Sequence, residues 1–119
     1  MVHALGAWGE EVAASHVASL GWDVLDRNWR CREGEIDLVA TSAGPSPCLV
    51  VIEVKTRRGT GFGDPLEAIT VEKLARLRRL AMAWVRAHPH PGMAVRVDAI
   101  GILKQPGFAP VIDHRVGVA

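Results

Sequence analysis

The chain has 119 residues, of which 49% are hydrophobic, and a formal net charge of +1 at pH 7. This length fits one domain spanning residues 1–119, and the apolar content excludes a disordered chain. No apolar run reaches the roughly 18–20 residues that cross a bilayer. The N-terminus carries Glu10 and Glu11 but no basic start, unlike a signal peptide. We therefore expect a cytoplasmic protein that does not contact membranes.

The N-terminal half predicts one helix followed by three strands. Helical spacing of Leu5, Trp8, Val12 and Leu20 predicts a helix over residues 4–20, ending at Gly21. Residues 22–29 are typical of a strand. Two further strands, 35–41 and 48–56, flank the turn sequence SAGPSP. Cys31 and Cys48 lack a CxxC spacing, so we expect free, buried thiols, with a disulfide or zinc site as the minor alternative.

The C-terminal half predicts a long helix and further strands. Residues 58–65 form a glycine-rich loop without the GKS or GKT of a P-loop, and Asp64-Pro65 favours a short helical turn. Thr70 is a good N-cap for a helix over 71–87. The sequence HPHPG ends this helix, and we interpret His88 and His90 as part of that stop.

Alternating hydrophobicity predicts a strand in AVRVDAIGIL, residues 94–103, and the tail APVIDHRVGV favours an edge strand. The short loops favour an antiparallel meander, and the long helix allows a parallel crossover. The fold class is therefore α/β. It is a central mixed sheet flanked by helices in the order α-β-β-β-α-β, with an extra C-terminal strand.

The two central strands carry an unusual set of ionisable residues: Glu35, Asp37, Glu53 and Lys55. If the hairpin is symmetric about Pro45, Asp37 lies opposite Glu53 and Glu35 lies opposite Lys55. Two carboxylates about 5 Å apart repel by about 3 kcal/mol at an effective dielectric near 20. A proton, Lys55 or a bound divalent cation must offset this repulsion.

Two interpretations of this charged cluster stand side by side. One is a salt-bridge network in which Lys55 pairs with Glu35 or Glu53. The other is a metal site, whose hard oxygen ligands favour Mg²⁺ or Mn²⁺ over zinc. Two arginine- and lysine-rich stretches, one containing Arg30 and one running from Lys55 to Arg86, either bind phosphates or form ordinary solvated surface.

Asp37 followed by Glu53-Val54-Lys55 resembles the D…(D/E)xK signature of the restriction-endonuclease-like nuclease superfamily. The wider chain resembles the YraN-like family within it, through GAWGEEVAASHVASLGWDVLDRNWRCREGEIDLVA, VVIEVKTR, FGDPLEAITVEKLARL and VRVDAIGI. That family is similar in layout to archaeal Holliday-junction resolvases. The resemblance implies a metal-dependent phosphodiesterase that acts on nucleic acid, with DNA the expected partner and a homodimer the expected assembly.

The resemblance also implies roles for single residues. Asp37 and Glu53 match the metal-binding acids, Lys55 matches the catalytic lysine, and the Val54 carbonyl supplies a third oxygen. Glu10 matches a helix carboxylate that completes the metal site, although the adjacent Glu11 leaves that choice open. Ile36 stands where the superfamily often has proline.

Other residues are assigned supporting parts. Glu35 is expected to be a partner of Lys55. The residues expected to contact nucleic-acid phosphates are Arg30, Arg57, Lys73 and Arg76. Asp98 either approaches the site or pairs with Arg96. The alternative function is a non-catalytic nucleic-acid- or protein-binding module, and a purely structural subunit is a third reading.

Overall fold

The computed structural model describes residues 4–59 and 64–119. The elements are α1 (Ala4–Ser19), β1 (Asp23–Cys31), β2 (Gly34–Thr41), β3 (Leu49–Arg58), a short 3-10 helix η1 (Pro65–Ala68), α2 (Val71–Ala87), β4 (Val95–Lys104) and β5 (Val111–Arg115). The expected element order is confirmed, including the C-terminal strand. Most of the glycine-rich loop, residues 60–63, lies outside the described residues.

The five strands form one mixed sheet in the order β1-β2-β3-β4-β5. β1, β2 and β3 pair antiparallel as a meander. β4 then pairs parallel to β3, as α2 supplies the crossover connection that a parallel pair needs. β5 pairs antiparallel to β4 and closes the sheet on the far side.

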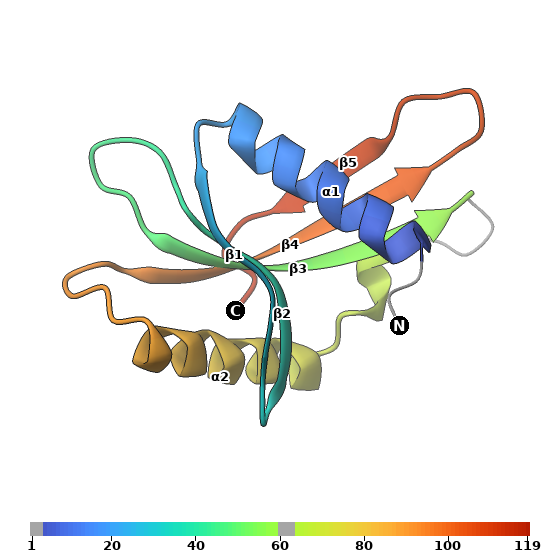
Figure 1. Ribbon diagram of the computed structural model, residues 1–119. Helices are drawn as coiled ribbons and strands as arrows, with labels where there is room; N and C mark the ends of the chain where they lie inside the picture. Colours follow the sequence, from blue (N-terminus) through green and yellow to red (C-terminus); the bar gives the residue numbers. More distant parts are fainter. Residues whose placement is uncertain (1–3, 60–63) are drawn as a thin grey trace.

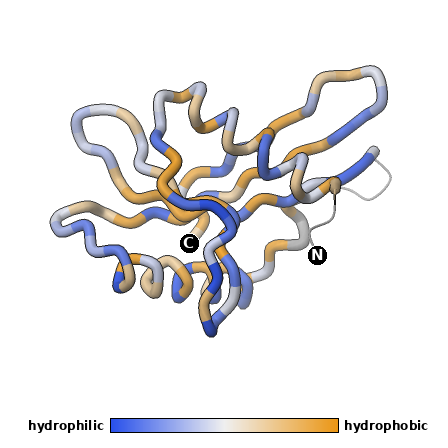
Figure 2. The backbone as a smooth tube through the Cα atoms, in the orientation of Figure 1, coloured by the Kyte–Doolittle hydropathy of each residue, from blue (hydrophilic) through white to orange (hydrophobic). Residues whose placement is uncertain are grey.

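One helix covers each face of the sheet (Figure 1). α1 packs Ala13, Ala14 and Val17 against one face, and α2 packs Leu77, Leu80, Ala81 and Trp84 against the other. The central strands β2, β3 and β4 contribute buried apolar residues to both cores, and hydrophobic segments accordingly follow the middle of the sheet (Figure 2). Among the described residues, no helix combines the length and the hydropathy needed to cross a membrane.

The ends of α2 follow the sequence expectation closely. The Thr70 hydroxyl accepts a hydrogen bond from the Lys73 amide, which caps the first turn. At the other end His88 is the C-cap, and its ring stacks on Trp84 with centroids 4.3 Å apart. The HPHPG stop is thus confirmed.

The fully buried residues of α1 are mostly small, and Trp8 and Val12 pack beside them against the same core. Leu20 lies beyond the helix and is 45% exposed, whereas the buried positions are Gly9, Ala13, Ala14 and Val17. Small residues bring the helix close to the sheet, and a Cβ at Gly9 would overlap the Thr56 side chain of β3. This close approach fixes α1 over the second half of β3.

β2 and β3 pair along only part of their length. Their ladder runs from Thr41↔Leu49 to Leu38↔Ile52 and stops there. Beyond this point β2 bends away with β1 as a curved hairpin, while β3 continues beside β4 to Arg58 (Figure 1). The sheet therefore opens between β2 and β3, and the charged residues of both strands lie at this opening.

Candidate active site

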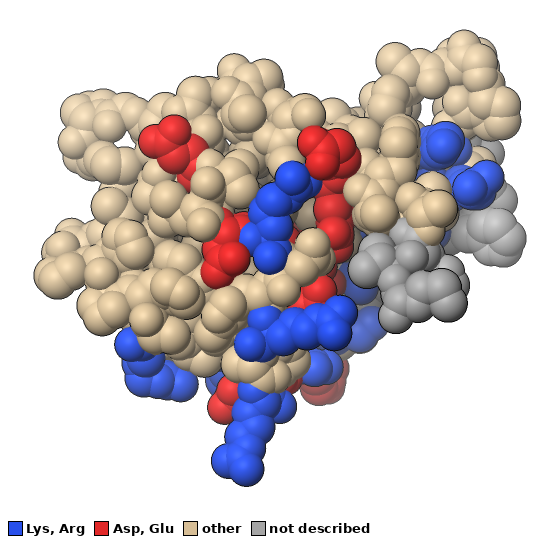
Figure 3. Space-filling model, viewed as in Figure 1, with Lys and Arg blue, Asp and Glu red and all other residues tan. Residues whose placement is uncertain are grey.

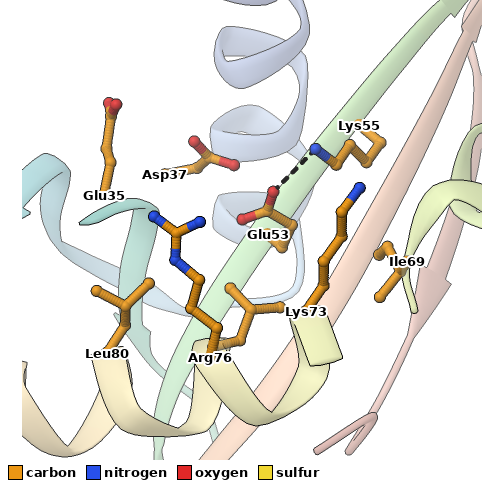
Figure 4. Close-up of a pocket in the computed structure, with 9 residues that line it drawn as sticks. Glu35, Asp37, Glu53, Lys55, Ile69, Lys73, Arg76 and Leu80 are labelled. Atoms are coloured by element: carbon orange, nitrogen blue, oxygen red, sulfur yellow. Dashed lines mark ion pairs between the residues drawn. The ribbon is translucent and has the colours of Figure 1, made fainter. Parts of the chain in front are cut away.

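A pocket of about 260 Å³ lies where β2 and β3 part, with α2 as its outer wall. Its polar lining comes from both strands and the helix, and comprises Glu35, Asp37, Glu53, Lys55, Lys73 and Arg76. Figure 4 shows the carboxylates of Asp37 and Glu53 directed into the same space, with Lys73 and Arg76 reaching toward them from α2. The pocket brings the central residues of the sequence prediction together.

The register of the hairpin accounts for this convergence. The pairs Val39↔Val51 and Leu38↔Ile52 confirm a hairpin that is symmetric about Pro45. Val39 and Val51 both pack in the α2 core, and side chains two residues apart share a face. Asp37 and Glu53 therefore both project toward α2, just past the last paired residues.

Asp37 is held in place by the neighbouring strand. Its Oδ2 accepts a hydrogen bond of 2.8 Å from the Val54 amide. Burial, followed by the charge of Glu53, raises the pKa of Asp37 to about 8, although the bond from Val54 acts in the opposite direction. The charges of Glu10 and Glu35 raise this pKa further. Four carboxylates from three elements thus share one electrostatic environment.

Lys55 partners Glu53 and not Glu35. The Lys55 Nζ lies 3.2 Å from Glu53 Oε1, whereas Glu35 pairs with Arg30 across β1 and β2 at 3.6 Å. The expected partnership of Glu35 with Lys55 is therefore wrong. It assumed that β2 and β3 stay paired beyond Leu38, and β2 bends away before Glu35 reaches Lys55.

The choice between the two adjacent acids of α1 is resolved by their neighbours. Glu10 lines a second hollow together with Val54 and Lys55, and its charge acts on Asp37. Glu11 points elsewhere and pairs with Arg27 of β1 at 2.9 Å. Glu10 is thus the α1 carboxylate at the site.

The four basic residues expected to contact phosphates occupy different places. Lys73 and Arg76 line the pocket, Arg30 projects from the β1–β2 hairpin with 70% of its side chain exposed, and Arg57 lies further along β3. On the face drawn in Figure 3, acidic side chains gather between α1 and α2, with lysines and arginines beside them. Cations therefore border the acidic cluster.

Arg76 is locked to the tip of the β1–β2 hairpin. Its Nε donates a hydrogen bond of 3.1 Å to the Glu33 carbonyl. A Cβ on Gly34 would lie 2.5 Å from its terminal nitrogen, so the absence of a side chain at Gly34 makes room for the guanidinium. The apolar wall formed by Ile69, Leu77 and Leu80 completes the pocket. This wall was not predicted from the sequence, although Leu77 and Leu80 recur at helical spacing on the buried side of α2.

Asp98 lies outside the pocket. It is fully buried on the α1 face and accepts two hydrogen bonds from Arg96, at 2.8 and 3.0 Å. His114 Nε2 and the Gly117 amide also bond to its carboxylate, at 2.8 and 3.0 Å. The pairing of Asp98 with Arg96 is therefore correct.

The cysteines, Cys31 and Cys48, are free as expected but only half-buried.

Among the described residues, no three Asp, Glu, His or Cys side chains are placed so that they could hold a metal ion as they stand. Burial and then the charge of Glu53 raise the pKa of Asp37, and carboxylate oxygens of this kind are the ligands that Mg²⁺ or Mn²⁺ prefers. The Val54 carbonyl lies on the same side of β3 as its amide, which faces Asp37. The oxygen donors suit such an ion in their chemistry, while Glu53 is paired with Lys55 in this structure.

Comparison with known proteins places the chain in a family. The model of "Uncharacterised protein family UPF0102" matches residues 9–102. A UPF0102 protein of Clavibacter michiganensis is 51% identical over 109 residues, covering 92% of this chain and 90% of the relative. A UPF0102 protein of Nocardia farcinica is 49% identical over 115 residues, covering 97% and 88%. The chain belongs to the UPF0102 family.

Proposed function

We propose that this protein is a metal-dependent nuclease that hydrolyses phosphodiester bonds of nucleic acid, with structured or branched DNA the expected substrate. The proposal includes membership of the restriction-endonuclease-like superfamily. The observation that carries it is the convergence of Asp37, Glu53 and Lys55 on one pocket, at the spacing of the D…(D/E)xK signature.

Asp37, Glu53 and Glu10 would hold Mg²⁺ or Mn²⁺, with the Val54 carbonyl as a further oxygen. The bound ion would polarise the phosphodiester and lower the pKa of an attacking water. Burial, followed by repulsion from Glu53 and the other carboxylates, raises the pKa of Asp37. A divalent cation relieves that repulsion, so the acids are suited to bind one.

The chain's own cations would then handle the substrate. Lys55 lies beside Glu53 and can donate hydrogen bonds to the attacking water or to the charge that develops on the phosphate. Lys73 and Arg76 approach from α2 and can bind the non-bridging oxygens, with Arg76 oriented by the Glu33 carbonyl. Arg30 on the hairpin would add a peripheral phosphate contact.

A non-catalytic binding module on the same fold is the second candidate. The ion pair between Lys55 and Glu53 favours it, since that pair partly neutralises the acids without any metal. In this case the cations would still bind nucleic acid, but no bond would be cut.

Cleavage assays separate the two candidates. Purified protein is incubated with linear, flapped and four-way DNA and with single-stranded RNA, in Mg²⁺, Mn²⁺ or EDTA. The nuclease proposal expects metal-dependent cutting that Asp37→Asn and Lys55→Ala abolish while binding persists. Glu11→Gln, whose residue pairs with Arg27 away from the pocket, is the matched control and should cut normally. Binding without cutting on every substrate favours the module.

A further inference from the structure

The edge of β3 is open beyond the point where β2 departs, and three neighbouring hollows, together called the groove, lie along it. The active-site pocket adjoins a hollow of about 320 Å³ through their shared residue Lys55. That hollow adjoins a third, of about 520 Å³, through Leu5 and Thr56. The third hollow ends at Arg57 and Arg58. The groove therefore runs from the acids to the end of the strand.

Backbone groups of β3 face this groove. The Val54 amide points away from β4 and donates to Asp37, whereas the Gly59 amide points to β4 and donates to the Lys104 carbonyl. Backbone direction alternates along a strand, so the amides of Thr56 and Arg58 point to the open side. The carbonyls of these two residues point to the same side, so donors and acceptors alternate along the groove floor.

Two cations, Arg57 and Arg58, line the far end of the groove, and Lys104 lies beside them on β4. Arg58 and Lys104 are register partners on β3 and β4. The Lys104 ammonium lies over the Trp8 ring of α1, 4.6 Å from its centroid, which orients it. Lysine and arginine side chains are visible at this end of the sheet in Figure 3.

These cations differ from the paired arginines elsewhere in the protein. Arg27, Arg96 and Arg115 each have a carboxylate partner. Among the described residues, no carboxylate forms an ion pair with any of the three groove cations. The buried Nε of Arg57 also has no hydrogen-bond partner among the described residues. A buried donor without an acceptor is unfavourable unless a ligand supplies one.

We propose that Arg57, Arg58 and Lys104 form a second phosphate-binding site, which holds the nucleic-acid backbone a few nucleotides from the bond that is cut. This inference rests on the proposed function and adds a path for the substrate along β3. Arg57 lies four positions beyond Glu53 along the strand, a distance of about 13 Å. The basic site is thus outside contact range of the scissile phosphate but within reach of the same strand.

The chemistry of the groove favours nucleic acid over a peptide added at the strand edge. An added peptide strand would be expected where the edge is flanked by apolar pockets. Here the groove ends at Arg57 and Arg58, with Lys104 beside them on β4. A repeating anion neutralises these charges, and its binding releases counterions.

The salt dependence of binding tests the second phosphate site. Affinity for fluorescein-labelled single-stranded and four-way DNA is measured by anisotropy in EDTA, over a range of salt concentrations. The variant Arg57→Gln/Arg58→Gln/Lys104→Gln is compared with wild type. Each lost phosphate contact lowers the steepness of log K against log salt by about 0.7–0.9. We expect a decrease of roughly 2 and an affinity loss of at least tenfold.

A matched variant removes the same charge elsewhere: Arg27→Gln/Arg79→Gln/Arg86→Gln. All three residues are exposed, and none lines the groove. It should keep the wild-type salt dependence. The single variant Arg58→Glu changes an exposed side chain and serves if the triple variant does not fold, with a several-fold loss of affinity expected.

Each outcome supports or overturns the proposal. An unchanged slope in the groove variant, with tight wild-type binding, overturns the second phosphate site and leaves the nuclease proposal standing. Wild-type protein that binds no nucleic acid even at low salt overturns both. Preferential binding of poly-L-glutamate would replace nucleic acid with an acidic protein partner and overturn the inference.

Discussion

The Asp37 carboxylate is tied to β3 by the hydrogen bond that it accepts from the Val54 amide at 2.8 Å. This bond joins the two strands just beyond Leu38↔Ile52, the last pair of their ladder. It directs Asp37 toward Glu53 at the point where the sheet opens. The site therefore depends on a local separation of strands, which leaves room for a ligand between them.

Asp37→Asn is expected to stabilise the metal-free protein. Burial and neighbouring carboxylates disfavour the charged side chain, and an Asn side-chain oxygen still accepts the Val54 amide bond. The gain in unfolding free energy at pH 8 should be on the order of 1–3 kcal/mol. Urea denaturation in EDTA measures it, with Glu11→Gln as the control acid. A destabilised Asp37→Asn would contradict the electrostatic account.

The free energy of unfolding of the metal-free protein should fall as the pH rises from about 4 to about 8. The pKa of Asp37 is raised from 3.8 to about 8 on folding. The folded state therefore holds a proton that the unfolded state has lost, so this group's contribution is full below pH 4 and declines as pH rises to about 8. Denaturation of wild type and Asp37→Asn across this range isolates the contribution, since only wild type should show it.

Saturating Mg²⁺ or Mn²⁺ should reverse this pH trend. Binding to the deprotonated acids stabilises the folded state, and more so at pH 8 than at pH 5. Thermal melting with and without the ion should show a shift that grows with pH in wild type and vanishes in Asp37→Asn. A shift that is the same in both proteins would place the ion elsewhere.

Lys55→Met is expected to separate binding from chemistry. Cutting should fall at least 100-fold, the size of effect seen when a transition-state donor is removed. Metal affinity should stay the same or rise, because Glu53 loses its competing partner. Single-turnover cleavage and Mn²⁺ titration measure the two effects. Normal cutting by this variant would exclude a catalytic lysine here.

Gly34→Ala should disturb the pocket through Arg76. Gly34 has φ of +142°, and an added Cβ would also meet the Arg76 guanidinium at 2.5 Å. We expect a loss of about 1–3 kcal/mol in unfolding free energy. Gly44→Ala is the matched control, with φ of +101° and no atom within 4 Å of the added Cβ. The excess cost at Gly34 should disappear in the Arg76→Ala background, in a double-mutant cycle.

The sequence predicted the charged hairpin well because its signals are local. A Pro45-centred turn and alternating apolar residues set the register, and a one-residue slip would expose the core. Asp37, Glu53 and Lys55 followed from that register. The family resemblance extended the prediction to Glu10, which the structure places beside Val54 and Lys55.

The failures arose from tertiary effects that no local pattern carries. The prediction for Glu35 assumed straight strands, whereas β2 bends away from β3 after Leu38. The fully buried positions of α1 are small residues and Val17, whereas Trp8 and Val12 pack only at the margin of that core, so large apolar residues alone did not locate the closest contact. His114 reaches Asp98 from a distant strand, which a pattern centred on Asp98 cannot reveal.

The most direct test of the central proposal is a crystal soaked in Mn²⁺ and measured at the manganese absorption edge. The account predicts an anomalous difference peak between Asp37 and Glu53, about 2.0–2.3 Å from their carboxylate oxygens, with Lys55 turned away from Glu53. The Asp37→Asn crystal should lack this peak. A well-ordered wild-type crystal with manganese bound only at other positions would contradict the account.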